Sequence, residues 1–121
     1  MTSVIIGTNV KAIDAWAFSN CQSLSSINLS GIETISSSFD GCSSLTSIDL
    51  SSCITIGSEA FNRCTSLTSI DLSSCTSIGK EAFKNCTSLT TITLGSNITL
   101  GSYVFAGCTS LTTINNTHYI T

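Results

Sequence analysis

Residues 45–66 read LTSIDLSSCITIGSEAFNRCTS, and residues 67–88 read LTSIDLSSCTSIGKEAFKNCTS. These stretches are two copies of one unit, and the same unit recurs on both sides of them. Met1 takes the leucine position in the first copy, and the last copy is only a first half. The sequence therefore predicts a single solenoid domain over residues 1–121. Its repeats one to five and a closing half repeat are residues 1–23, 24–44, 45–66, 67–88, 89–110 and 111–121.

The leucine spacing identifies the kind of repeat. A period of about 20 to 29 residues with the pattern L-x-x-L-x-L-x-x-N/C-x-L marks leucine-rich repeats. Repeat three fills that pattern with Leu45, Ile48, Leu50 and Cys53, while in repeat five Asn97 takes the N/C position and is expected inside the turn. Because one unit cannot bury its own apolar face, neighbouring units must stack. We therefore predict an α/β leucine-rich-repeat solenoid.

The repeat also predicts the shape of each layer. The L-x-x-I-x-L segments are expected to pair as a parallel sheet with strands about 4.8 Å apart. The Thr-Ser-Ile-Gly segment is expected to form a second short parallel strand, and Ala-Phe-x-x-Cys a short helical turn. Gly57, Gly79 and Gly101 mark a change of direction, where glycine accepts a positive φ at no steric cost. One phenylalanine per repeat should stack into an interior ladder: Phe18, Phe39, Phe61, Phe83 and Phe105.

The second half of the unit is more particular than a general leucine-rich repeat. It reads Ile-Gly-x-x-Ala-Phe-x-x-Cys at residues 56–64 and 78–86, and Ala-Phe-x-x-Cys recurs at 17–21. With this motif the 22-residue repeat resembles the BspA-like leucine-rich repeat family over essentially the whole chain. The chain departs from the family at Ser51, Ser73 and Gly95, where the family often has proline, and repeat two is one residue short.

The cysteines follow the same period. Five of the seven close the Phe-x-x-Cys unit, and they are expected to stack as small buried hydrophobic residues. Stacking about 4.8 Å apart exceeds the usual Cβ separation of a disulfide, roughly 3.8 Å, although Cys53 and Cys75 could pair if the backbone narrows. A line of single cysteines without Cys-x-x-Cys does not converge on a metal. We therefore expect neither a metal nor a cofactor.

Charge and motifs exclude several functions. The formal net charge is −3, and the few basic residues form no patch for nucleic acid. No apolar run reaches the roughly 20 residues of a membrane span, and no signal peptide opens the chain. The single histidine, His118, has no nucleophile or carboxylate assigned to it by a motif, so no catalytic residue is predicted. We expect a protein that is not an enzyme.

Polar residues on the outward side of the first strand form the candidate binding surface. The column between the Ile and the Leu of each strand includes Asp49 and Asp71 in neighbouring repeats. Like charges at such positions must share a cation, raise one pKa, or be tolerated in water. Hydroxyl groups surround them and suit many weak hydrogen bonds with a protein or a glycan. The predicted site residues are Ser47, Asp49, Ser69, Asp71, Thr91, Thr93, Thr113 and Asn115.

The ends of the stack offer an alternative function. Solenoids need terminal repeats with a polar outer face, but both ends of this chain place apolar residues there. Open strand edges invite another chain to add a strand, and head-to-tail contacts between copies propagate into a filament. The alternative is thus a structural subunit that associates with itself through Met1, Val4, Ile6, Leu111, Ile114 and Ile120.

The resemblance implies which kind of protein this is. BspA-like repeats occur in surface proteins that serve adhesion, so the resemblance implies an interaction module at the cell surface or outside the cell. Its implied partner is a protein of the host matrix or of another cell surface. This inference is by analogy, because a fold does not dictate a function.

Overall fold

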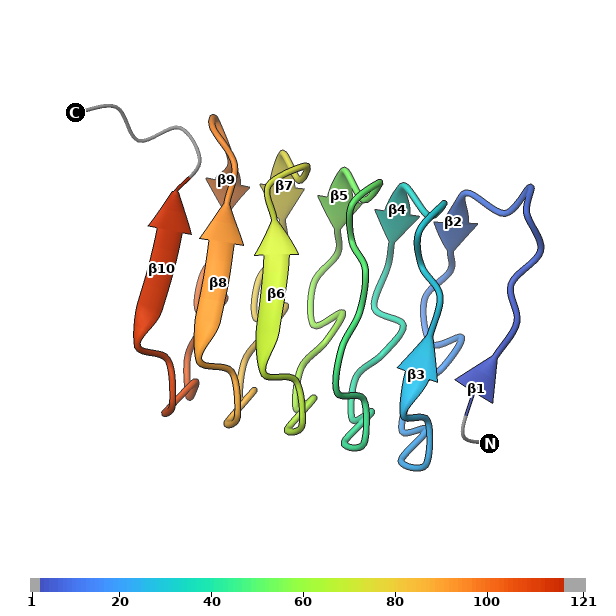
Figure 1. Ribbon diagram of the computed structural model, residues 1–121, viewed down its shortest axis with the longest axis horizontal. Helices are drawn as coiled ribbons and strands as arrows, with labels where there is room; N and C mark the ends of the chain where they lie inside the picture. Colours follow the sequence, from blue (N-terminus) through green and yellow to red (C-terminus); the bar gives the residue numbers. More distant parts are fainter. Residues whose placement is uncertain (1–2, 117–121) are drawn as a thin grey trace.

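The computed structural model describes residues 3–116 and shows a two-sided solenoid (Figure 1). Each complete turn of the chain passes once along a front side and once along a back side. The front strands are β1 (Ser3–Val4), β3 (Ser26–Ile27), β6 (Ser69–Leu72), β8 (Thr91–Leu94) and β10 (Thr113–Asn116). The back strands are β2 (Ala12–Ile13), β4 (Thr34–Ile35), β5 (Thr55–Ile56), β7 (Ser77–Ile78) and β9 (Thr99–Leu100).

The back sheet is continuous. Its five strands pair in parallel in the order β2-β4-β5-β7-β9, one strand from each repeat. The register places Ile35, Ile56 and Ile78 opposite one another, and all three are fully buried. The second short strand of each repeat, predicted from the sequence, is confirmed.

The front side is interrupted. Strands β1 and β3 form one parallel pair, and β6, β8 and β10 form a separate three-stranded parallel sheet. Residues 45–50 of repeat three lie between these two groups in the chain but adopt no strand conformation. The leucine segments were all expected to join one sheet, so this part of the prediction was wrong. The hydrogen-bond ladder of the front side is broken at repeat three.

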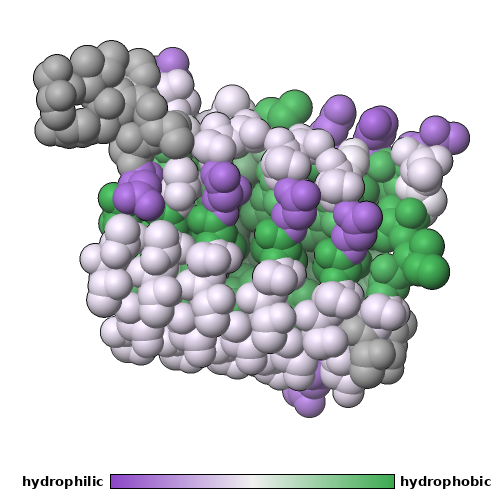
Figure 2. Space-filling model, in the orientation of Figure 1, coloured by the Kyte–Doolittle hydropathy of each residue, from purple (hydrophilic) through white to green (hydrophobic). Residues whose placement is uncertain are grey.

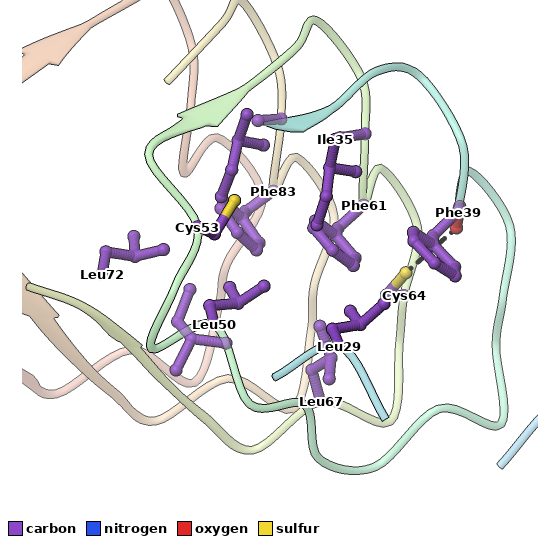
Figure 3. Packing of buried hydrophobic residues seen from close by; sticks show 14 of the residues in the cluster. Leu29, Ile35, Phe39, Leu50, Cys53, Phe61, Cys64, Leu67, Leu72 and Phe83 are labelled. Carbon is purple, nitrogen blue, oxygen red and sulfur yellow. Dashed lines mark hydrogen bonds between the residues drawn. The ribbon is translucent and has the colours of Figure 1, made fainter. Parts of the chain in front are cut away.

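The core lies between the two sides and consists of ladders of identical residues (Figure 3). The five phenylalanine rings stack nearly parallel, with centroid separations of 5.3, 5.1, 5.2 and 5.9 Å along the series. Phe39, Phe61 and Phe83 are completely buried. The rings follow the layer spacing because each repeat places its phenylalanine at the same point, as the sequence predicts.

The cysteine column lies beside the phenylalanines, and its thiols donate hydrogen bonds to their backbone carbonyl oxygens. The Sγ of Cys64 donates to the carbonyl oxygen of Phe39 at 3.2 Å, drawn as a dashed line in Figure 3. Equivalent hydrogen bonds of 3.1 to 3.3 Å join the thiols of Cys42, Cys86 and Cys108 to the carbonyl oxygen of the phenylalanine one repeat earlier. All seven cysteines lie within the described residues and are free thiols. The expected column of buried cysteines is confirmed for Cys42, Cys64 and Cys86, whereas Cys21 and Cys108 at its two ends are only half-buried.

The predicted helical turn is wrong, because none of the residues 3–116 forms a helix. Residues 57–64 make three successive tight turns, which are closed by hydrogen bonds from Ala60 N to Gly57 O, from Asn62 N to Glu59 O and from Cys64 N to Phe61 O. The amide of Phe61 donates instead to Ala82 O of the next repeat at 2.7 Å, and that of Glu59 also donates across the layers. A helix would need these amides for its own i−4 carbonyls. The fold is therefore a β-solenoid.

The expected role of the glycines also needs correction. The left-handed positions of the turns are held mostly by other residues, including Glu59 (φ 59°) and Arg63 (φ 63°). Gly79 has no positive φ, but a Cβ there would lie 2.5 Å from Ser58 N of the preceding repeat. At Gly101 it would lie 2.6 Å from a backbone nitrogen of the preceding repeat. These glycines are required because two backbones approach closely, and not because of their φ.

The turn of repeat five departs from the pattern as well. Asn97 was expected inside the turn, yet it is exposed and adopts a φ of 58°. The next residue, Ile98, packs against the core in its place. In repeats three and four the equivalent positions are buried cysteines. An apolar residue directly after Asn97 therefore takes the interior position, since its burial is more favourable than that of an amide.

Candidate functional site on the front face

Serine and threonine side chains divide into two groups by what they contact. One group joins the layers: the hydroxyl of Ser66 donates to Ser43 O at 2.6 Å, and that of Thr90 donates to Thr68 O at 3.0 Å. Ser44 and Ser52 likewise donate to a carbonyl of the preceding repeat. Hydroxyls at these positions satisfy backbone acceptors, so they serve the fold. The other group faces outward on the front strands.

The predicted site residues belong to that outward group. The register aligns Ser69, Thr91 and Thr113 in one column and Asp71, Thr93 and Asn115 in a second. Ser47 and Asp49 hold the same places in repeat three, where no strand forms. Thr91 and Thr93 are half-buried, and the other six residues are exposed. We call these two columns, with their counterparts in repeats one and two, the front face.

Two carboxylates on the front face close local turns. The amide of Ser51 donates to Asp49 Oδ1 at 2.9 Å, and the amide of Ser73 donates to Asp71 Oδ1 at 2.9 Å. Hydrogen bonds from the Ser51 hydroxyl and then from its amide lower the pKa of Asp49. A proton shared between the two carboxylates would raise a pKa instead. For Asp49, an ionised carboxylate in contact with water therefore fits best among the three arrangements left open by the sequence.

A groove crosses the front face over repeats one to three. It has a volume of about 510 Å³ and passes the break in the front sheet. Its floor is formed by Val4, Ile27 and Ile48, the inward residues of three successive segments. One rim carries the serine hydroxyls of Ser3, Ser26 and Ser47. The opposite rim changes from aliphatic to polar along the groove, from Ile5 through Asn28 to Asp49. Figure 2 shows a row of hydrophilic side chains above an apolar band on this face.

The charges of the front face are all negative. Asp49 and Asp71 are its only ionisable residues, because the front strands and residues 45–50 contain no Lys, Arg or His. The basic side chains lie elsewhere, where Arg63 bonds Asp40 at 3.1 Å and Lys84 bonds Glu81 at 3.0 Å. The local field therefore favours a cationic or neutral partner over an acidic one.

Burial makes the thiols in the middle of the cysteine column unreactive. Burial raises the pKa of Cys42 to about 11 and that of Cys86 to about 12. Cys53 and Cys75 form no disulfide; instead, the Cys75 thiol donates a hydrogen bond to Cys53 O at 3.2 Å. A thiol that stays protonated is a poor nucleophile and a poor metal ligand. Within residues 3–116, no three His, Cys, Asp or Glu side chains are placed to hold a metal ion.

The ends of the solenoid carry part of the predicted self-association set. A hollow of about 400 Å³ at the first repeat is lined by Val4, Ile6 and other apolar residues, and Ile5 is 98% exposed. At the other end Leu111 is half-buried and Ile114 is 60% exposed. Met1 and Ile120 lie outside the described residues.

Sequence reasoning did not find the groove or two exposed aromatic residues. Trp16 and Tyr103 take the place that Glu59 and Glu81 hold in the middle repeats, and both are more than 60% exposed. Repeat alignment could have identified these two. For the groove, the only signal was the missing residue of repeat two, just before the segment that fails to form a strand.

Comparison with protein families gives a clear result. The profile of the BspA-type leucine-rich repeat region matches residues 1–112 in six copies. No curated protein is significantly similar in sequence to the chain. None of the described residues forms a helix long and apolar enough to cross a membrane.

Solved bacterial structures are similar in fold and sequence. A leucine-rich repeat protein of Treponema pallidum superposes with a TM-score of 0.87 at 30% identity, covering 93% of this chain and 57% of that protein. One from Bacteroides ovatus gives a TM-score of 0.76 at 30% identity, with 93% and 37% covered. A leucine-rich cell surface protein of Faecalibacterium prausnitzii gives 0.81 at 26% identity, with 98% and 33% covered. The chain thus spans less than two thirds of each.

Proposed function

Because the chain belongs to the BspA-type leucine-rich repeat family, we propose that it is a non-enzymatic protein-binding module whose partner contacts the front face. Leucine-rich repeat proteins of this kind are typically interaction modules. One observation carries the proposal: six of the eight predicted site residues are exposed and the other two half-buried, and unlike Ser66 or Thr90 they are not used to join the layers. Surfaces with hydroxyl groups at regular spacing present many hydrogen-bonding groups to a partner.

We further propose adhesion at a cell surface, with a host matrix or cell-surface protein as the partner. The similarity to a cell surface protein of Faecalibacterium prausnitzii supports this location. The proposal concerns the surface that these repeats would offer within such a protein.

The test compares front-face with back-face variants on purified, immobilised matrix and cell-surface proteins. Changing Asp49, Asp71, Ser69 and Thr91 to bulky residues should abolish binding. The free energy of unfolding should fall by no more than about 2 kcal/mol, because these side chains lie outside the core and mainly the two turn bonds of Asp49 and Asp71 are lost. The matched control carries equal changes on the back strands at Thr34, Thr55, Ser77 and Thr99. Binding that survives the front-face variant, or is lost equally in the control, contradicts the proposal.

A second candidate function is self-association through the ends of the solenoid. It is favoured by the apolar hollow beside Val4 and by the exposed side chain of Ile114. The two ends differ in shape, however. Among the described residues, β10 covers β8 at the front, while β9 has no neighbour on its outer side at the back.

Sedimentation velocity tests the second candidate directly. Self-association predicts a sedimentation coefficient that rises with concentration, and substitution of Val4 and Ile114 by Glu should abolish that rise. The same substitutions on the exposed back-sheet residues Thr34 and Thr99 serve as the control. A species of 12.6 kDa at every concentration would eliminate the filament.

A further inference from the structure

Resting on the proposed function, we infer that the groove over repeats one to three binds an extended segment of the partner protein. In that segment an apolar side chain is followed two residues later by Lys or Arg. The inference narrows the front face to the part lined by β1, β3 and residues 47–49. It also assigns a role to the break in the front sheet, which none of the fold-forming interactions explains.

The apolar side chain is expected at the end of the groove that belongs to repeat one. There the floor is Val4 and the rim is Ile5, whose side chain is 98% exposed. Ile5 stands in the column that is otherwise polar, so repeat one replaces a polar rim by an aliphatic one. An aliphatic side chain resting between Ile5 and the floor removes apolar surface from water on both partners.

The cation is expected at the other end of the groove, in repeat three. Asp49 is exposed, its Oδ1 is oriented by the Ser51 amide, and no Lys or Arg of the front face competes for it. Asn28 stands between the two ends and offers a neutral polar group; its Oδ1 is similarly fixed by the Ser30 amide at 3.0 Å. The groove thus changes from aliphatic to anionic over three repeats.

The spacing of the partner residues follows from the layer spacing. Repeats one and three are two strand separations apart, or about 10 Å at roughly 4.8 Å each. In an extended chain, side chains at positions i and i+2 point the same way and lie about 6.6 Å apart. The long side chain of Lys or Arg spans the remaining distance to Asp49. A glycan is a less suitable occupant, because no aromatic ring lines this groove for a sugar to stack on.

The experiment titrates isotopically labelled protein with blocked tripeptides and follows amide shifts by NMR. Acetyl-Leu-Ser-Lys-amide should shift the amides of residues 26–28 and 47–49 in a saturable manner. Acetyl-Leu-Ser-Glu-amide should bind about two- to fivefold more weakly, the usual range for losing one exposed ion pair. Acetyl-Ser-Ser-Lys-amide should also bind more weakly. Maltose serves as the probe for a glycan. Equal binding of the three peptides, no localised amide shift, or a larger localised shift with maltose than with the peptides would overturn the inference.

Three variants connect the shifts to the groove. Asp49→Asn should remove the preference for Lys over Glu, whereas Glu33→Gln, an equal charge change on the back side, should preserve it. Ser26→Phe should fill the groove and abolish binding, whereas Ser69→Phe, the same change in the same column outside the groove, should not. The dispersion of the NMR spectrum verifies that each variant is folded. Identical binding by Asp49→Asn and Glu33→Gln would contradict the inference.

The result can be separated from that of the proposed function. If the front-face variant loses matrix binding while the tripeptides show no localised shift, the groove inference fails and the interaction module stands. If the tripeptides bind as expected while matrix binding survives in the front-face variant, the proposed function fails.

Discussion

The back sheet and the front side of this solenoid are built from the same repeats, yet they differ in continuity. Every complete repeat contributes two residues to one unbroken back sheet, β2-β4-β5-β7-β9. On the front side the ladder stops at repeat three, although its sequence there, LTSIDL, is identical to that of repeat four, which forms β6. An identical sequence with and without a strand shows that pairing depends on the neighbouring layers.

The difference in continuity suggests different roles for the back sheet and the front side. The back sheet and the turns beside it hold the layers at a fixed spacing, through backbone bonds and through glycines that permit close approach. The front side can lose part of its ladder and still keep its leucines buried, as Leu45 and Leu50 show. Its outward residues form the proposed binding surface. Four predictions test this division, from the largest expected effect to the smallest.

The largest effect is expected in the core that both sides share. Phe61→Ala removes a fully buried ring from the middle of the phenylalanine ladder. The free energy of unfolding should fall by about 3 to 5 kcal/mol, because the ring is lost and a cavity remains. Urea denaturation followed by circular dichroism measures the change. Phe61→Leu should lose clearly less, and equal losses in the two variants would show that ring volume is not what matters.

A smaller loss is expected where the backbones meet beside the back sheet. Gly79→Ala places a Cβ 2.5 Å from Ser58 N, so the turn of repeat four must shift. A loss of about 1 to 3 kcal/mol is expected, as for other overpacked sites. Gly31→Ala is the matched control, because no heavy atom lies within 4 Å of its added Cβ. If both variants have the same thermal stability, close approach does not fix the layer spacing.

Alkaline pH should weaken the cysteine column. The folded pKa of Cys42 is raised from its ordinary value of 9.0 to about 11. Between those pH values the unfolded thiol has lost its proton while the folded one keeps it, so stability falls as pH rises. The melting temperature should therefore be lower at pH 10.5 than at pH 8. This decrease should be smaller in Cys42→Ala than in the unchanged protein. An unchanged difference between the two pH values in Cys42→Ala would assign the alkaline loss to other groups.

The smallest effect is expected on the front face. Asp49→Ala removes the acceptor of the Ser51 amide and should cost about 0.5 to 1 kcal/mol, as for one exposed hydrogen bond. Asp49→Asn keeps an acceptor oxygen and should be neutral within about 0.5 kcal/mol. Thermal unfolding of both variants measures this. A cost above that of Gly79→Ala would mean that the front face serves the fold as much as the back sheet does.

Much of this fold could be predicted by aligning the repeats. The phenylalanine ladder, the buried Cys64 column and the second strand at residues 55–56 all follow from placing equivalent residues in register. The helical turn was predicted wrongly because residue spacing alone does not reveal that the Phe61 amide donates to the next repeat. For the candidate site, alignment predicted the column positions of Ser69 and Asp71, but not the groove.

By itself, the sequence determined the repeat, its period and the residues that face inward, because each layer must bury its apolar residues against the next. Only the tertiary structure decided where the front ladder stops, why Gly79 must be glycine, and which outward residues share a groove with Val4 and Ile27. These features depend on distances between layers. Such distances are set by the packing of all the repeats together, and no single repeat carries them in its sequence.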